Sequence, residues 1–239
     1  LDNHTLLISK EGIELPIEDS AAPIKDQDGN INGVVIVFRD FTEKKERQDK
    51  IKYLSFHDQL TGLYNRRYFE EELKRLDVPR NLPLTIVVAD VNGLKLANDA
   101  FGHLVGDRIL QRAAEIMKKE CRADDIIARI GGDEFVILLP KTDSRQTVKI
   151  VRRINRIIAN EKVESINLSV SFGWKTKRET TEEIAEIFKQ AEDYMYRRKL
   201  SESSTMRHMT LNLIIRTLYE KNEREQQHAV RVSQLCADI

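Results

Sequence analysis

The chain has 239 residues, of which 41% are hydrophobic, and its 39 Lys and Arg residues balance its 39 Asp and Glu residues. This length allows one or two domains around one sizeable core. The zero net charge excludes a general basic field for nucleic acid or an anionic membrane, so any site for a phosphorylated ligand has to be local.

Residues 1–41 are typical of β-structure. ELPIEDSAAPI and INGVVIVFRD are strand-like, and DQDGN between them indicates a turn. The segment is too short for its own core, so it is either the end of a larger domain or a hairpin packed on another element. Its apolar run GVVIVF (33–38) is strand-sized, well short of the roughly 20 residues of a membrane-spanning helix, and we predict no such span.

Residues 42–56 are charged and favour a helix, with Thr42 as the expected N-cap. Ile51 and Leu54 fit a short a/d pattern. A solvated connecting helix and a dimerising coiled coil both remain open.

From residue 57 to about 200, helix and strand patterns alternate. The predicted helices are 65–76, 106–121, 145–160 and 181–199, and the predicted strands are 83–91, a hairpin over 124–140, and 165–174. This order predicts an α/β sandwich, with helices covering a mixed central sheet.

Residues 201–239 are polar with a helical pattern, and we expect the chain to be part of a longer protein. Cys121 and Cys236 lie far apart and show no metal-ligand spacing. We interpret them as reduced thiols of a cytoplasmic protein.

The stretch RIGGDEFVILL (129–139) places two carboxylates at the tip of an apolar hairpin. A two-residue Gly-Gly turn tolerates positive φ and lets a ligand approach the backbone. Asp90 ends another apolar run, so Asp90 and Asp133 meet if the two strands are neighbours. Close carboxylates repel unless a cation lies between them, and oxygen-only ligands favour Mg²⁺. A solvated acidic turn is the alternative.

Polar residues interrupt the apolar pattern of DVNGLKLANDAFGHLVGD (90–107). Lys95 can contact a phosphate as a point charge. Asn98 and Asp107 match a guanine edge, because a carboxylate accepts from its ring N–H and amine. The alternative is that Asn98 and Asp107 are helix caps, and that His103 is a loop residue without a chemical role.

The sequence GGDEF at 131–135 resembles the defining motif of GGDEF domains, which act as diguanylate cyclases. The resemblance extends over about 150 residues, because FHDQLTGLYNRRYF (56–69), ADVNGLKLANDAFGHLVGD (89–107) and AEDYMYRRK (191–199) resemble further motifs of that family. It implies a fold similar to the palm of nucleotide cyclases and polymerases.

The resemblance also implies roles for individual residues. Asp90, Asp133 and the Val91 carbonyl would bind Mg²⁺ or Mn²⁺, and Asp133 or Glu134 would assist deprotonation of the attacking ribose hydroxyl. The implied substrate-binding residues are Lys95, Asn98, His103, Asp107, Gly131, Gly132 and Lys199. Two GTP would be joined into cyclic di-GMP with release of two pyrophosphates. Because one domain holds one GTP, a homodimer is implied.

Arg122 and Asp125 form an R-x-x-D motif just before the glycines. Its position resembles the inhibitory site of the family, where the product cyclic di-GMP binds and stops turnover. Arg and Asp are both able to recognise guanine. A surface ion pair between the two residues is the alternative.

The flanks resemble other signalling domains. Residues 1–41 resemble the last strands of a PAS domain, 42–56 a linker helix, 57–200 the GGDEF domain, and 201–239 the first helix of an HD-GYP phosphodiesterase with His228 as its first metal-ligand histidine. Ser203 stands where the family often carries a phosphate-binding arginine, and Arg198 is the alternative source of that charge. A catalytically weak GGDEF module that regulates the phosphodiesterase therefore stays open beside an active cyclase.

Overall fold

The computed structural model describes residues 5–164 and 166–201. The chain divides into two compact units, Leu1–Ser55 and Phe56–Ile239. Within the described residues, no helix is both long and apolar enough to cross a lipid bilayer.

The first unit is a small antiparallel sheet with strand order β1-β2-β3. Its strands are β1 (Thr5–Ile8), β2 (Glu14–Lys25) and β3 (Ile31–Asp40). The predicted turn after β2 is present, and the Asp26 carboxylate accepts the backbone N–H groups of Asp28 and Asn30 there. Most of its apolar side chains are exposed, as expected for a segment with too little chain for a core.

Helix α1 (Thr42–Phe56) follows β3, and none of its residues is buried. The prediction that Thr42 is the N-cap is wrong, because the helix already includes Thr42. The Asp40 carboxylate instead accepts the Thr42 backbone N–H at 2.8 Å. An acidic side chain thus satisfies a free donor at this helix start.

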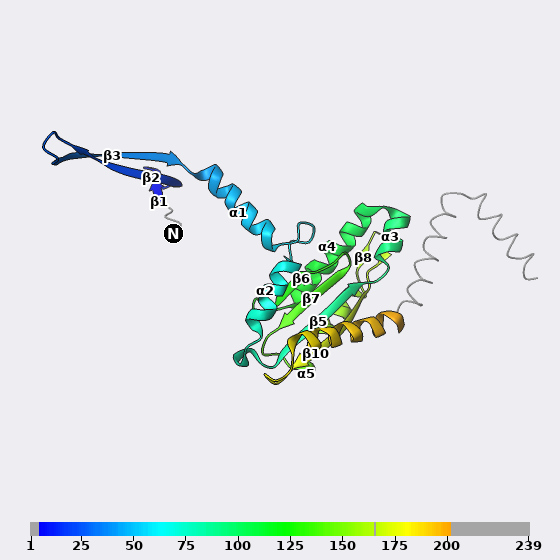
Figure 1. Cartoon of the computed structure of the whole chain (residues 1–239). Coiled ribbons are helices and arrows are strands. Elements are labelled where there is room, and N and C mark those ends of the chain that lie inside the picture. The colour runs from blue at the N-terminus through cyan, green and yellow to red at the C-terminus, as the bar shows by residue number, and fades with distance from the viewer. Residues whose placement is uncertain (1–4, 165, 202–239) are drawn as a thin grey trace, which may run out of the picture. The chain divides into compact units, whose positions relative to one another are not determined.

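The second unit is built on a five-stranded sheet with strand order β10-β5-β7-β6-β4 (Figure 1). Its strands are β4 (Tyr64–Asn65), β5 (Leu84–Val91), β6 (Ile126–Arg129), β7 (Glu134–Leu139) and β10 (Val170–Lys177). Neighbouring strands are antiparallel except β4 and β6, which are parallel. The sheet is therefore mixed, as predicted. A small separate sheet pairs β8 (Lys162–Val163) with β9 (Ile166–Asn167).

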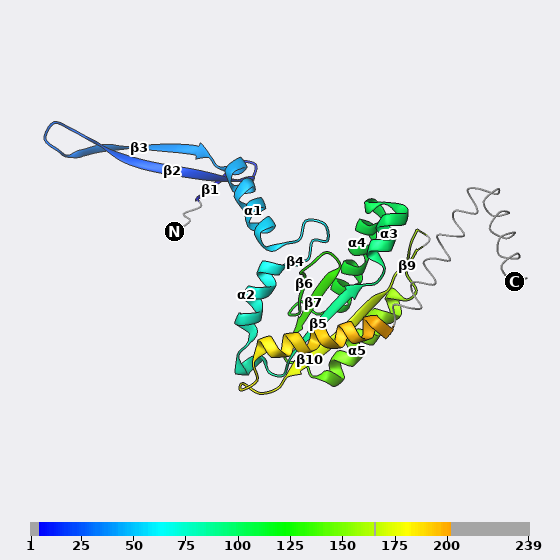
Figure 2. The same ribbon diagram turned by 45° about the vertical axis from the view of Figure 1, so that its right-hand side comes forward.

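Helices cover both faces of this sheet (Figure 2). They are α2 (Arg66–Leu76), α3 (Leu94–Phe101), α4 (His103–Glu120), α5 (Ser144–Ile158), the short 3-10 helix Pro79–Asn81, and a last helix over residues 184–201. Helices α4 and α5 pack on one face, while α2 and the last helix pack on the other. The predicted α/β sandwich is confirmed.

The burial of the central strands explains their sequences. Every residue of β5 is buried, since both faces of the strand are covered by helices. Asn65, the predicted N-cap of α2, accepts the Tyr68 backbone N–H at 3.1 Å. The buried apolar residues of β5 and β7 hold in place the strand ends at which Asp90 and Glu134 lie.

Candidate active site at the end of the central strands

Asp90 lies near the end of β5, between two hydrogen-bonded strands. In the register of the sheet it is opposite Glu134 of β7 and Ser171 of β10. Asp90 is only 3% exposed. Its Oδ1 atom is buried and has no hydrogen-bond partner among the described residues. A buried carboxylate oxygen without a partner is costly, so this position is suited to a bound cation or ligand.

Lys199 of the last helix joins Asp90 to Asp133. Its Nζ donates to Asp90 Oδ2 at 2.6 Å and lies 3.9 Å from Asp133 Oδ2. Burial raises the pKa of Asp90 to about 6, and the Asp133 charge adds to this, while the hydrogen bond from Lys199 opposes it. The structure thus brings Asp90 and Asp133 together at one sheet end, around a positive charge.

The hairpin between β6 and β7 differs in detail from the predicted two-residue turn. Residues 130–133 connect the strands, with the Ile130 N–H donating to the Glu134 carbonyl at 2.9 Å. Neither Gly131 nor Gly132 has a positive φ. A Cβ at Gly131 would lie 2.7 Å from Glu134 Oε2, whereas one at Gly132 would meet nothing within 4 Å. Gly131 therefore makes room for the acid, and Gly132 leaves the turn open to a ligand.

Arg129 fixes this turn, a role that sequence reasoning did not identify. Its guanidinium donates to the Gly132 carbonyl at 2.7 Å and to Asp58 Oδ1 at 3.1 Å. Although burial opposes it, the hydrogen bonds from Thr61 and Arg129 hold the pKa of Asp58 below its ordinary value. The loop before β4 and the glycine turn are thereby held together.

Asn98 and Asp107 lie on the paired helices α3 and α4. Both residues lie inside these helices, whose N-caps are Gly93 and Gly102, so the helix-cap alternative is wrong. The Oδ1 atom of Asn98 is buried without a partner among the described residues. A Cβ at Gly106 would come within 1.9 Å of that Oδ1. Gly106 thus gives the Asn98 side chain room against α4, in which Asp107 is the next residue.

Lys95 and His103 lie near the starts of the same two helices. Lys95 is the second residue of α3 and His103 is the first of α4, and both are exposed. The arrangement leaves them accessible to a ligand near the sheet end.

Asn92 ties the loop after β5 to β10. Its Nδ2 donates to the hydroxyls of Ser169 at 2.9 Å and Ser171 at 3.0 Å. Asn92 is therefore a positioning residue for the loop that follows Asp90. Its neighbour Val91 donates its N–H to the Asp133 carbonyl at 3.0 Å, which joins the two acidic segments through their backbones.

The donor set fits Mg²⁺ better than a metal that needs a complete protein cage. No group of three or more His, Cys, Asp or Glu side chains in the described residues is arranged to hold a metal by itself. Asp90 and Asp133 nevertheless supply two converging carboxylates, and one oxygen of Asp90 is without a partner in the described residues. Mg²⁺ usually takes one or two carboxylates and completes its shell with water and substrate phosphates.

Arg122 and Asp125 lie in the connection from α4 to β6. Asp125 is buried, which raises the pKa of its carboxyl, and it accepts the Arg122 backbone N–H at 2.7 Å. Among the described residues, no ion pair joins the two side chains, so the predicted alternative of a surface ion pair is wrong. Both residues line a cavity of about 250 Å³, together with His57, Tyr64 and Lys118.

Arg198 is the residue expected to supply charge for phosphates in place of Ser203. Its guanidinium lies 4.8 Å from the Trp174 ring centre, while the neighbouring Lys199 donates to Asp90. Ser203, His228 and the proposed HD-GYP helix lie outside the described residues.

The comparisons with known proteins agree with this geometry. A family model described as "Diguanylate cyclase, GGDEF domain" matches residues 55–205. The chain is 30% identical over 172 residues to diguanylate cyclase DgcM of Escherichia coli, covering 70% of this chain and 41% of DgcM. It therefore spans less than half the length of this curated relative.

Solved structures share the fold. The coiled coil and GGDEF domain of DgcB from Caulobacter crescentus, in complex with c-di-GMP, matches with a TM-score of 0.61 and 23% identity, covering 67% of this chain and 88% of that one. A microbial GGDEF domain, solved in a study of its interaction with cyclic di-GMP, matches with a TM-score of 0.56 and 32% identity, covering 64% and 96%. The likeness to the DgcB structure, at 23% identity, shows the fold alone.

Proposed function

The chain belongs to the GGDEF family of diguanylate cyclases, and from this membership we propose that its second unit condenses two GTP into cyclic di-GMP. The observation that carries the proposal is the meeting of Asp90 and Asp133 beside the open glycine turn, around the Lys199 ammonium. Such a cluster of acids and a cation suits phosphoryl chemistry, which depends on positioning and charge neutralisation.

Asp90, Asp133 and the Val91 carbonyl would hold Mg²⁺ or Mn²⁺. When bound, the ion neutralises phosphate charge and orients the reacting groups. Asp133 or Glu134, at the start of β7, would accept the proton of the attacking 3′-hydroxyl. That hydroxyl attacks the α-phosphate in line, and pyrophosphate leaves. Repeating the step in the opposite direction closes the ring and releases the second pyrophosphate.

The remaining site residues would bind GTP. Asn98 and Asp107 would hold the guanine, because the carboxylate accepts from its N–H groups and the amide both donates and accepts. Lys95 and Lys199 would contact phosphates, with His103 near the substrate. Gly131 and Gly132 would let the triphosphate lie against the backbone of the turn.

Catalysis would require a homodimer. Each site holds one GTP, and each GTP supplies both an attacking hydroxyl and a phosphate under attack. Two protomers must therefore face each other. An α1 that buries none of its own residues remains compatible with both a coiled coil and a solvated connection.

We also propose that the product regulates the enzyme. Arg122 and Asp125 line a cavity separate from the carboxylate pair, with Lys118 adding positive charge. Cyclic di-GMP bound there would inhibit turnover, with guanine and phosphate contacts from the arginine. The flanking segments would belong to a PAS sensor and an HD-GYP phosphodiesterase in a cytoplasmic parent protein, in which both cysteines would be reduced thiols.

Asp133→Ala tests the assignment. We expect the variant to bind GTP but to form no cyclic di-GMP by mass spectrometry, while Asp28→Ala, which changes an exposed acid of the first unit, forms product at the wild-type rate. If wild-type protein binds GTP but forms no product, the second unit is a regulatory binding module instead. Unchanged product formation by Asp133→Ala contradicts the proposed role of the carboxylate.

A further inference from the structure

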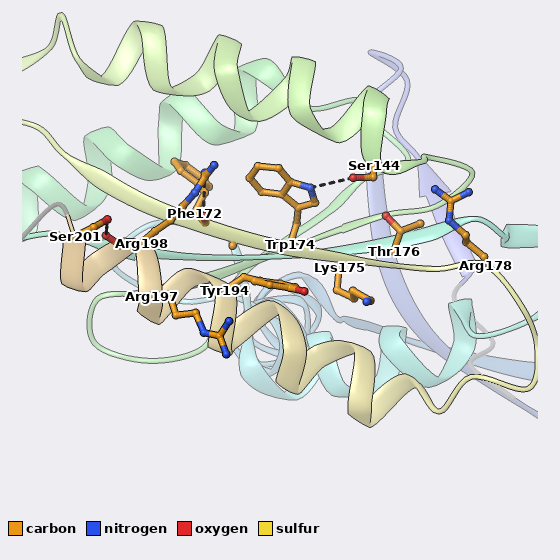
Figure 3. A pocket seen from close by; sticks show the side chains of 11 residues that line it. Ser144, Phe172, Trp174, Lys175, Thr176, Arg178, Tyr194, Arg197, Arg198 and Ser201 are labelled. Atoms are coloured by element: carbon orange, nitrogen blue, oxygen red, sulfur yellow. Dashed lines mark hydrogen bonds between the residues drawn. The ribbon is translucent and has the colours of Figure 1, made fainter.

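A second and larger cavity, of about 600 Å³, lies along β10, the edge strand of the sheet (Figure 3). Its size is in the range of small-molecule sites. Its lining begins at Phe172, directly after Ser171, and continues along the strand to Thr176 and Arg178. The cavity shares no lining residue with the carboxylate pair or with the Arg122 cavity.

The lining of the cavity is positively charged. Lys175, Arg178, Arg197 and Arg198 contribute to it, and no carboxylate does among the described residues that line it. The nearby Glu182 carboxylate accepts the backbone N–H groups that follow β10, at 2.6 and 2.9 Å. An anionic ligand would therefore gain charge-assisted hydrogen bonds here without facing a lining acid.

Two aromatic side chains accompany the charges. The indole of Trp174 is held by the Arg198 guanidinium, 4.8 Å from the ring centre, and its Nε1 lies 3.4 Å from the Ser144 hydroxyl. Arg198 also donates to the Phe172 carbonyl at 3.3 Å. Tyr194 lies across the strand edge from Trp174 and is 45% exposed. A ligand lying across the edge can contact both rings.

The close approach of the last helix creates this arrangement. A Cβ at Gly173 would lie 2.0 Å from the Met195 backbone nitrogen, so only glycine lets the helix pack directly on β10. Tyr194, Arg197 and Arg198 are spaced i, i+3 and i+4, which places them on neighbouring positions of one helix surface. The strand and helix thus present rings and cations to one cavity.

We propose that this cavity binds a nucleotide, with its base on the Trp174 and Tyr194 rings and its phosphate on the surrounding cations. Base–aromatic stacking tolerates any base, and guanidinium groups bind phosphate bidentately. A bare phosphate leaves the rings unused, and an uncharged nucleoside leaves the cations unused. The site therefore selects a ligand that carries both a ring and an anion.

Trp174 allows a direct test, because it is the only tryptophan of the chain. Its fluorescence is followed while the full chain is titrated with adenosine 5′-monophosphate, adenosine or inorganic phosphate. The adenine base avoids the guanine-selective pair of the candidate active site. We expect a saturable change with adenosine 5′-monophosphate, and an affinity at least about tenfold above those of adenosine and inorganic phosphate.

Matched double variants locate the binding. Lys175→Ala/Arg197→Ala should weaken binding at least about tenfold. Lys74→Ala/Arg80→Ala removes the same charge from exposed positions outside the cavity and should change the affinity less than about twofold. If Lys175→Ala/Arg197→Ala lowers the melting temperature, the nucleotide affinity of the single variant Arg178→Ala is compared with that of wild type instead.

Three results would overturn the proposal. They are the absence of a saturable fluorescence change with the nucleotide, equal affinities for the nucleotide and either of its parts, and equal effects of the two double variants. None of these results depends on cyclase activity, so the proposed function and this inference stand or fall separately.

Discussion

Replacing Gly106 by alanine should weaken GTP binding without touching the substrate. The added Cβ would lie 1.9 Å from Asn98 Oδ1 and 2.9 Å from Asn98 Cγ. The first distance is about 1.5 Å shorter than a nonbonded carbon contact allows, so the Asn98 side chain has to move. Loss of a hydrogen-bonding partner for the guanine costs about 1–3 kcal/mol, so Kd for GTP should rise about 5- to 150-fold.

The assay is calorimetric titration with a non-hydrolysable GTP analogue, on Gly106→Ala, Asn98→Ala and the double variant. Because the alanine acts by displacing Asn98, the two changes should not add, and the double variant should bind like Asn98→Ala. Gly33→Ala is the control, since its Cβ would meet only Ile24 Cδ1 at 3.6 Å. Wild-type affinity in Gly106→Ala, or fully additive losses in the double variant, would refute the positioning role.

Other consequences concern stability and reactivity. Gly173→Ala puts a Cβ 2.0 Å from the Met195 backbone nitrogen, and should lower the free energy of unfolding by at least about 2 kcal/mol in urea titrations; an unchanged midpoint would contradict the close packing. Asp58→Asn breaks the pair with Arg129 and should cost about 1 kcal/mol at pH 7. Because the pKa of Asp58 is lowered in the folded protein, the difference in unfolding free energy between wild type and variant is present above pH 3.8, the ordinary pKa of Asp. It is lost as the pH falls through the lowered pKa, and a constant difference across this range would contradict the reasoning. Burial raises the pKa of the Cys121 thiol to about 12, so with the other cysteine replaced by serine the folded protein should resist iodoacetamide at pH 8 and react only in denaturant.

The sequence predicts the elements of the second unit well, because their patterns are strong and local. The fully apolar run before Asp90 indicates a buried strand, and Asn65 signals the start of α2 through its capping side chain. The meeting of Asp90 and Asp133 follows once the two strands are taken as neighbours.

Local sequence patterns do not reveal the contacts that organise the site. Lys199 is 109 positions from Asp90, and Arg129 is 71 from Asp58, so no local pattern links either pair. The prediction for the start of α1 fails for a different reason. Asp and Thr are both residue types that cap helices, and only the backbone shows that Asp40 precedes the first turn while Thr42 belongs to it.

The measurement that tests the central claim most directly is product formation from GTP and Mg²⁺ by the purified chain, followed by mass spectrometry at several protein concentrations. A cyclase whose two sites lie on different protomers should form cyclic di-GMP at a rate that rises more steeply than linearly with protein concentration, until the dimer saturates. Folded protein that forms no cyclic di-GMP at any concentration would contradict the claim.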